Sequence, residues 1–138
     1  MREFYICIDF DGTIVDHDYP DIGKPVLYAI KYIKEFQKLG AKIILFTMRS
    51  GEPLNEAVDY LKECGIELFG VNINPTQKNW TSSPKAYGNL YIDDAAFGCP
   101  IIKYAHLKQP CVDWSIVGPL VVEILEDRKT AEEISKLY

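Results

Sequence analysis

The sequence predicts an α/β fold: a single-domain, Rossmann-like three-layer sandwich built on a mainly parallel central sheet. Short apolar runs alternate with amphipathic segments, so that strands and helices follow one another along the chain. Such an order implies right-handed crossovers and helices on both faces of the sheet. The 138 residues suit one domain with a full core, and no repeat or linker divides the chain. We therefore expect a single domain over residues 1–138.

The first predicted strand lies within residues 4–13, which read FYICIDFDGT. Its continuous apolar run is typical of a strand that is buried on both faces. Because strand side chains alternate, Asp9 and Asp11 should point to the same side and Phe10 to the other. Two carboxylates this close are costly unless a cation lies between them or one of them carries a proton. The plainer interpretation is an acidic Asp-Gly turn after a strand.

The next elements carry loop, helix and strand signals in turn. Residues 14–24 are polar and rich in turn formers, which indicates a loop with a hairpin-like excursion. Pro25 should be the first residue of a helix that ends at Gly40, since apolar residues recur at helical spacing between them. Residues 41–46 form a second apolar run and predict a second strand. A second helix should open at Pro53.

The second half of the chain is less regular. Residues 75–88 form the longest polar stretch and, with two prolines, predict a loop. A third helix is expected over residues 113–126. The spacing of Thr130 and Glu133 resembles a capping box that opens a short terminal helix. Three further strands are predicted, over residues 67–74, 89–92 and 99–102.

Composition limits the classes of function. The net charge is −5, and no basic run is present to neutralise nucleic-acid phosphates, so no nucleic-acid partner is expected. No stretch is apolar for long enough to span a bilayer, and the N-terminus shows no signal-peptide pattern. The four cysteines lack the spacing of metal ligands, which favours free thiols in a reducing, cytoplasmic setting. A dense apolar run in the third helix leaves homo-oligomerisation open.

Polar residues follow three of the predicted strands and should meet at the sheet edge where parallel α/β proteins bind ligands. These residues are Asp9, Asp11, Thr47, Asp93 and Asp94, with Lys85 shortly before the fourth strand. Several carboxylates near one another suit Mg²⁺, which prefers a few carboxylates together with water and substrate phosphate. A lysine and a threonine hydroxyl suit the oxygens of a phosphoryl group. Each residue alone is also compatible with a turn or a solvated surface position.

The order of these residues resembles the motifs of the haloacid dehalogenase (HAD) superfamily. The first motif, Asp-x-Asp-x-Thr, corresponds to residues 9–13, and the second, a Thr or Ser that ends an apolar strand, to Thr47. The acidic pair that ends a later strand corresponds to residues 93–94. The third motif is a lone lysine, for which Lys85 fits best and Lys78 is the alternative. The intervals between the motifs leave no room for a folded cap domain, so the chain resembles a small capless (C0-like) phosphatase.

The resemblance implies a phosphatase that works through an aspartyl-phosphate and uses Mg²⁺ as its cofactor. Asp9 would be the nucleophile, and Asp11 would serve first as general acid and then as general base. Thr47 and Lys85 would contact the phosphoryl group. The metal ligands would be Asp9, Asp93, Asp94 and, through its backbone carbonyl, Asp11. The expected substrate-binding residues are Gly12, Thr13, Thr47, Arg49 and Lys85.

The expected substrate is a small phosphorylated metabolite, and no membrane partner is expected. A phosphotransferase that uses the same intermediate is an alternative, as is a non-catalytic module that binds phosphate and Mg²⁺. A receiver-type signalling module is disfavoured. Such a module would need its phospho-accepting aspartate at the end of a middle strand before Thr47, but the strand before Thr47 offers none and the acidic pair comes after Thr47. His17 lies in the loop after the first motif and could contact substrate or be an ordinary surface histidine.

Overall fold

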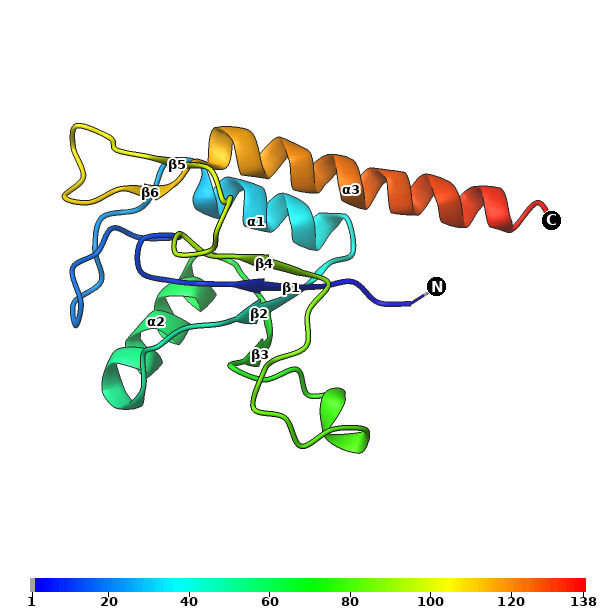
Figure 1. Cartoon of the computed structure of the whole chain (residues 1–138), viewed down its shortest axis with the longest axis horizontal. Helices are drawn as coiled ribbons and strands as arrows, with labels where there is room; N and C mark the ends of the chain where they lie inside the picture. The colour runs from blue at the N-terminus through cyan, green and yellow to red at the C-terminus, as the bar shows by residue number, and fades with distance from the viewer. Residues whose placement is uncertain (1) are drawn as a thin grey trace.

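The computed structural model describes residues 2–138 and has an α/β fold, which confirms the predicted class. Its main sheet is parallel and four-stranded, in the order β3-β2-β1-β4 (Figure 1). The strands are β1 (Tyr5–Ile8), β2 (Lys42–Leu45), β3 (Leu68–Val71) and β4 (Leu90–Ile92). The helices are α1 (Ala29–Lys38), α2 (Gly51–Glu63), the 3-10 helix η1 (Gln77–Asn79) and α3 (Trp114–Ser135).

The first strand lies inside the sheet, with hydrogen-bonded neighbours on both sides. Ile8, its last residue, lies beside Leu45 of β2 and Ile92 of β4. The carboxyl ends of these three strands therefore finish at the same edge. Whatever follows them in the sequence is brought together there, which is the usual ligand-binding edge of an open parallel sheet.

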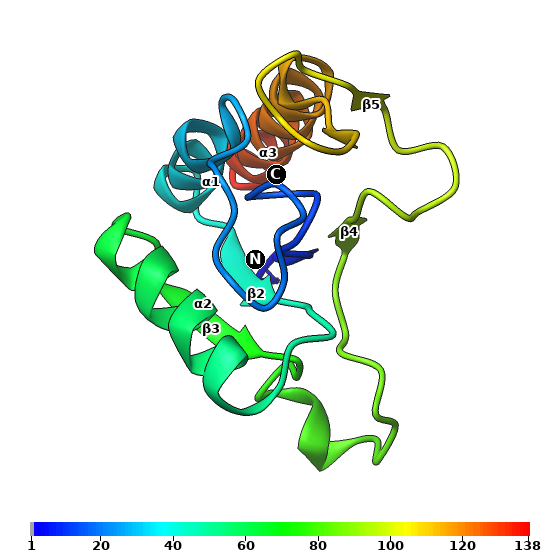
Figure 2. The same ribbon diagram turned by 90° about the vertical axis from the view of Figure 1, so that its left-hand side faces the viewer.

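The two faces of the sheet are covered differently. Ile6 and Ile8 of β1 pack into a core that they share with α1, α2 and α3. Cys7 and Ile44 point to the other face and pack against Ala86, in the segment that leads from β3 to β4. Figure 2 shows α1 and α3 on one side of the strands and the segment with η1 on the other. The second face is thus covered by the predicted loop with one 3-10 turn, so the expectation of helices on both faces of the sheet was wrong.

Topology explains this difference. From β1 to β2 and from β2 to β3, each new strand is added on the same side of the preceding one in the sheet. Two right-handed crossovers in the same direction place α1 and α2 on the same face. The chain then returns past β1 to reach β4, and this return passes over the opposite face as residues 72–89.

Both predicted helix starts at proline were wrong by a few residues. Pro25 pairs with Val15 in an isolated antiparallel bridge, so it belongs to the excursion after β1. The first helix begins only at Ala29, after Tyr28 with a left-handed φ of 70°. The second helix begins at Gly51, and Pro53 lies in its first turn, where a missing amide donor costs no helical hydrogen bond.

The C-terminal region is one continuous helix, α3, so the prediction of a separate terminal helix was wrong. Residues 126–135 contain neither glycine nor proline and consist largely of good helix formers, so nothing ends the helix near Thr130. Asp113 caps its start by accepting a hydrogen bond from the Ser115 amide (3.1 Å). The helix packs on α1 and extends past the rest of the fold (Figure 1). No helix within residues 2–138 is long and apolar enough to cross a membrane.

A short antiparallel pair, β5 (Ile101–Ile102) and β6 (Cys111–Val112), stands beside the main sheet. The sequence predicts only the first of them, because two residues carry too little pattern for the second. Buried Asp16 ties the loop between them to the excursion after β1. Its carboxylate accepts hydrogen bonds from the amides of His17 (2.9 Å), Lys108 (2.6 Å) and Gln109 (3.2 Å).

We expect Asp16→Ala to lower the free energy of unfolding by about 2 to 4 kcal/mol, because three amides lose a charged acceptor. Burial opposes ionisation of Asp16, but these amide bonds outweigh it, so the pKa of Asp16 is lowered. The folded pKa lies below the unfolded one, so this contribution is present at neutral pH and is lost as the pH falls below about 4. Urea denaturation at pH 7 and pH 3 measures both effects.

Asp18→Ala is the control for Asp16→Ala. The Asp18 carboxylate forms an exposed ion pair with Lys108 (2.7 Å), and such pairs contribute less than about 1 kcal/mol. Equal destabilisation by the two substitutions would contradict the assigned role of Asp16.

Candidate metal centre

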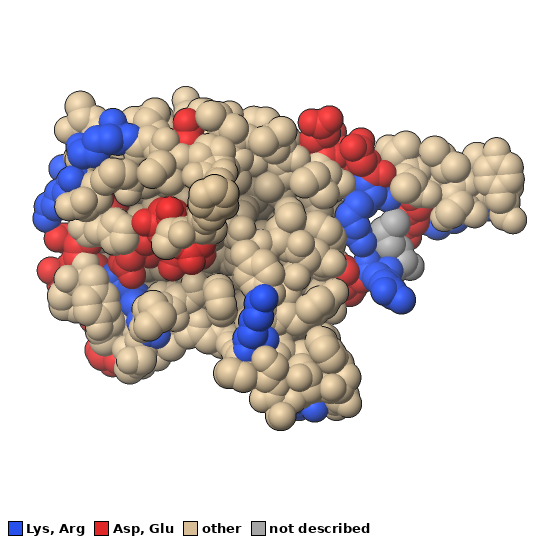
Figure 3. All heavy atoms as spheres, in the orientation of Figure 1, with Lys and Arg blue, Asp and Glu red and all other residues tan. Residues whose placement is uncertain are grey.

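The carboxylates that follow β1 and β4 form an acidic cluster at the carboxyl edge of the sheet. The Asp9 amide donates to the Ile92 carbonyl (2.9 Å), which continues the β1–β4 ladder by one residue. Phe10 is fully buried, whereas Asp9 and Asp11 line one pocket, as strand alternation predicts. Figure 3 shows acidic side chains gathered at this end of the molecule. Asp9, Asp93 and Asp94 each offer an oxygen within 4.8 Å of the others.

This cluster is electrostatically unfavourable without a cation. Burial, reinforced by the charge of Asp93, raises the pKa of Asp9 from 3.8 to about 8. Burial also raises the pKa of Asp93, and the neighbouring Asp94 adds to the shift. Carboxylate oxygens in a partly buried group of this kind are the donors that hard divalent cations prefer. The three side chains therefore fit a metal ion.

Thr13 links the Asp9 side chain to the Asp94 backbone through its hydroxyl group. Its buried hydroxyl donates to Asp9 Oδ2 (2.9 Å) and accepts from the Asp94 amide (3.2 Å). Its carbonyl accepts from Trp114 Nε1 (2.7 Å), which links this turn to α3. The predicted substrate-binding residue Thr13 is fully covered in this structure, so its contacts are those of a positioning residue.

Gly12 is required by its backbone conformation and by its neighbours. Its φ is +82°, and a Cβ atom added there would overlap His17 Nε2 and Asp94 Oδ2. His17 Nε2 in turn lies 3.0 Å from Asp94 Oδ2. The absence of a side chain at position 12 thus lets His17 reach the acidic cluster, a contact that no sequence spacing predicts.

Thr47 follows β2 and lines the same pocket. Its amide donates to Asn72 Oδ1 (2.7 Å), and its hydroxyl accepts from the Arg49 amide (3.1 Å). The Asn72 amide donates to the Leu45 carbonyl (2.7 Å), so the ends of β2 and β3 are joined through Asn72. The structure therefore holds Thr47 beside Asp9 at the sheet edge.

Arg49 is almost completely buried, with only 1 % of its side chain exposed. It forms a bidentate pair with Asp11, from Nε to Oδ2 (2.8 Å) and from Nη2 to Oδ1 (2.7 Å). The other donors reach three backbone carbonyls, those of Pro20 (2.9 Å), Pro53 (3.2 Å) and Asp21 (2.7 Å). The guanidinium also lies 5.0 Å from the Phe10 ring centroid and 5.2 Å from that of Tyr19.

These contacts change the interpretation of Arg49. Every guanidinium donor is already used inside the protein, so the predicted role in binding substrate would require contacts to break. Arg49 instead positions the Asp11 carboxylate and joins the excursion after β1 to the start of α2.

Neither of the two lysines predicted to contact the phosphoryl group lines the acidic pocket. Lys85 is exposed, its Nζ lies over the Tyr91 ring (5.3 Å to the centroid), and it does not line the pocket that contains Asp9. Lys78, the alternative, is exposed in η1. The loop is held in this place by buried Gln77, which donates to the Lys85 carbonyl (2.9 Å) and accepts from the Tyr87 amide (2.8 Å).

The pocket at the acidic edge has a volume of about 540 Å³. It is lined by the residues already described, by Ala95 and by two larger side chains, Tyr19 and Met48, which are exposed at its rim. Sequence reasoning did not single out either of these two. Both lie in turns after strands, where a lone apolar residue carries no periodic signal.

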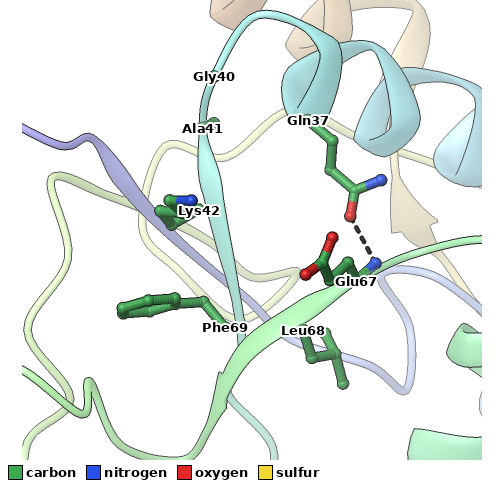
Figure 4. A pocket seen from close by; sticks show the side chains of 7 residues that line it. All are labelled: Gln37, Gly40, Ala41, Lys42, Glu67, Leu68 and Phe69. Atoms are coloured by element: carbon green, nitrogen blue, oxygen red, sulfur yellow. Dashed lines mark hydrogen bonds between the residues drawn. The ribbon is translucent and has the colours of Figure 1, made fainter.

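Another hollow lies at the opposite edge of the sheet, around Lys42 and Glu67 (Figure 4). Its main polar contact is structural: Gln37 Oε1 accepts from the Glu67 amide (2.6 Å). Among residues 2–138, no group of metal-ligating side chains lies there. The candidate site is therefore the acidic edge.

Comparison with known proteins gives a relationship but no activity. No family model matches the chain, and no curated protein does. A solved structure, described as that of a conserved protein coded by a locus from Bacteroides thetaiotaomicron, matches with a TM-score of 0.72 and 31 % identity. The match covers 88 % of this chain and 92 % of that one. The chain belongs to the same family as this conserved Bacteroides protein.

Proposed function

We propose that the protein is a Mg²⁺-dependent phosphomonoester hydrolase of the HAD type, without a cap domain, that acts through an aspartyl-phosphate on Asp9. The observation that carries this proposal is the position of Asp9, which ends the inner strand β1 within 4.8 Å of Asp93 and Asp94. The order of Asp9, Asp11, Thr47 and the acidic pair along the chain also supports it.

The side chains of Asp9, Asp93 and Asp94 would hold Mg²⁺, with the backbone carbonyl of Asp11 as a further oxygen ligand. When bound, Mg²⁺ would offset negative charge on the carboxylates and on the phosphoryl group. A donor set of three carboxylates, with His17 contacting Asp94, favours Mg²⁺ over softer metals.

The residues of the chain would divide the reaction between them. An Asp9 oxygen attacks phosphorus, the ester P–O bond breaks, and the leaving oxygen takes a proton from Asp11. For this step Asp11 would have to release the Arg49 guanidinium, which contacts both of its carboxylate oxygens in this structure. Water then attacks the phosphorus of the aspartyl-phosphate and gives a proton to Asp11, which releases inorganic phosphate and restores Asp9. Thr13 holds the Asp9 Oδ2 atom in place, and the Thr47 hydroxyl would orient the phosphoryl group. A role for Lys85 would require the loop over residues 75–88 to move.

The raised pKa of Asp9 predicts a pH-dependent metal affinity. With a pKa of about 8, Asp9 holds a proton at neutral pH that must leave when the metal binds. We expect Mg²⁺ affinity to rise by up to about tenfold per pH unit between about pH 6 and pH 8. Calorimetric titration at both pH values, in buffers of different ionisation enthalpy, measures affinity and proton release. The Asp9→Asn variant should lose the dependence, and equal affinity of the parent protein at both pH values would refute it.

The function is tested by phosphate release from 4-nitrophenyl phosphate, with Mg²⁺ or with excess chelator, in the parent protein and in Asp9→Asn. We expect turnover only with Mg²⁺ and intact Asp9. Turnover that survives Asp9→Asn would rule out the mechanism. Bound Mg²⁺ without turnover of any ester would favour a binding module, and a phosphorylated product formed from an added alcohol would indicate a phosphotransferase.

A further inference from the structure

Two exposed side chains at the rim of the acidic pocket, Tyr19 and Met48, are placed to contact the organic part of a substrate. Tyr19 is 61 % exposed and Met48 is 98 % exposed, and both line the pocket that contains Asp9. A fully exposed methionine beside a site is well suited to contact ligands, because its side chain is apolar and adaptable. The Tyr19 ring packs against the buried Arg49 guanidinium, whose Cζ atom lies 5.2 Å from the ring centroid.

Among the described residues that line the pocket, each side chain that can carry a positive charge already contacts a carboxylate. Arg49 and His17 are the cationic or potentially cationic residues among those that line it. Arg49 has its donors on Asp11 and on three backbone carbonyls. His17 Nε2 is engaged with Asp94 Oδ2 (3.0 Å).

The rest of the lining offers a second anion no compensating charge. The Asp11–Arg49 pair is neutral overall, so a divalent ion would leave at most one net negative charge on Asp9, Asp93 and Asp94, and the bound phosphoryl group of the substrate would add more. A substrate carboxylate or second phosphate would lie near like charges, without a free partner to offset the repulsion.

We infer that the phosphate ester taken by this pocket has an uncharged leaving group with an apolar face, which contacts Tyr19 and Met48. This inference rests on the proposed hydrolase function and adds a substrate class to it. The chemistry disfavours esters that carry a second acidic group on the leaving group, and it favours a flat or hydrocarbon surface over a polyhydroxylated one.

The test compares kcat/KM for three alkyl phosphates of similar intrinsic reactivity: benzyl phosphate, 4-carboxybenzyl phosphate and 2-hydroxyethyl phosphate. Burial of an aromatic group predicts that benzyl phosphate is at least about tenfold better than 2-hydroxyethyl phosphate. Like-charge repulsion predicts that 4-carboxybenzyl phosphate is also about tenfold worse than benzyl phosphate. Equal values for the three esters, or the highest value for the carboxylated one, would overturn the inference.

Substitutions at Tyr19 and Met48 test whether these two side chains cause the preference for an apolar leaving group. Tyr19→Ala should lower kcat/KM several-fold more for benzyl phosphate than for 2-hydroxyethyl phosphate, and Met48→Ala, at a fully exposed position, should do the same. Trp80→Ala is the matched control, because Trp80 is similarly exposed (63 %) but does not line the pocket. It should leave the ratio unchanged. Asp9-dependent hydrolysis without these preferences would overturn the inference alone, whereas no Asp9-dependent hydrolysis of any ester would overturn the proposed function with it.

Discussion

Asp9→Asn is expected to abolish phosphate release while making the metal-free protein more stable. Loss of a covalent nucleophile should lower kcat by at least about 10³-fold, since much of the rate depends on the group that attacks phosphorus. Stability should change in the opposite direction, because Asn cannot ionise and so removes the cost of keeping Asp9 either protonated or charged in a partly buried acidic cluster. A residue that served only to hold the fold together would lose stability together with activity.

The stability gain should depend on pH. In the parent protein the folded pKa of Asp9 is about 8 and the reference value is 3.8, so between these values the folded state binds more protons than the unfolded state. Stability of the metal-free parent therefore falls as the pH rises through this range, by up to about 1.4 kcal/mol per pH unit from this group. Asn does not titrate, so the difference between the two proteins should widen from pH 5 to pH 8.

Guanidinium chloride denaturation with chelator present, at pH 5 and pH 8, measures this difference. Asp127→Asn is a suitable control, because Asp127 is an exposed carboxylate on α3. Its substitution should change stability little at either pH. A difference between parent and Asp9→Asn that does not vary with pH would show that Asp9 is not held in the unfavourable environment described above.

Arg49→Ala should be among the most destabilising single substitutions in the chain. It leaves the Asp11 carboxylate without its bidentate partner and removes the guanidinium donors from the carbonyls of Pro20, Asp21 and Pro53. Removing one member of a buried ion pair costs about 3 to 5 kcal/mol. Arg49→Lys should recover only part of the loss, because an ammonium group cannot reproduce the planar fork that contacts Asp11 and the carbonyls together.

Chemical denaturation of Arg49→Ala, Asp11→Ala and the double variant measures the coupling between the two side chains. We expect the double variant to be clearly more stable than the sum of the single effects implies, since the second substitution removes a charge that the first left unpaired. Arg128→Ala is the control: the Arg128 guanidinium donates to the Arg2 carbonyl (2.8 Å) and lies over the Phe4 ring (4.5 Å), and the substitution should cost about 1 to 2 kcal/mol. Additive effects at Arg49 and Asp11 would contradict the proposed positioning role.

The strands and the acidic edge were predictable because their signals are local. Apolar runs that end in polar residues mark the strands, and alternation places Asp9 and Asp11 on one side of Phe10. The parallel order of the strands then brings Asp93 and Asp94 to the same edge as Asp9. Each step needs only the neighbouring residues and a rule of topology.

The surroundings of Arg49 and Lys85 were not predictable in the same way. Three of the acceptors of Arg49 are backbone carbonyls, which leave no trace in the residue types of the sequence. A lone lysine has no partner at a fixed spacing, so its distance from the site depends on the path of a long loop. That path is set by the side chains of Asn74 and Gln77, both buried polar residues in a stretch that reads as a solvated loop.

The segment over residues 72–89 has a consequence for local unfolding. Gln77 alone binds four backbone groups of this segment, those of Asn74, Ser83, Lys85 and Tyr87. Breaking one of these contacts weakens the others, so the segment should open as a unit, below the free energy of global unfolding. Opening would uncover the Cys7 thiol, which is now buried and near the carbonyls of Ala86 and Tyr87. Access of reagents to Cys7 would therefore follow the opening of this segment, while the helical face of the sheet stays folded.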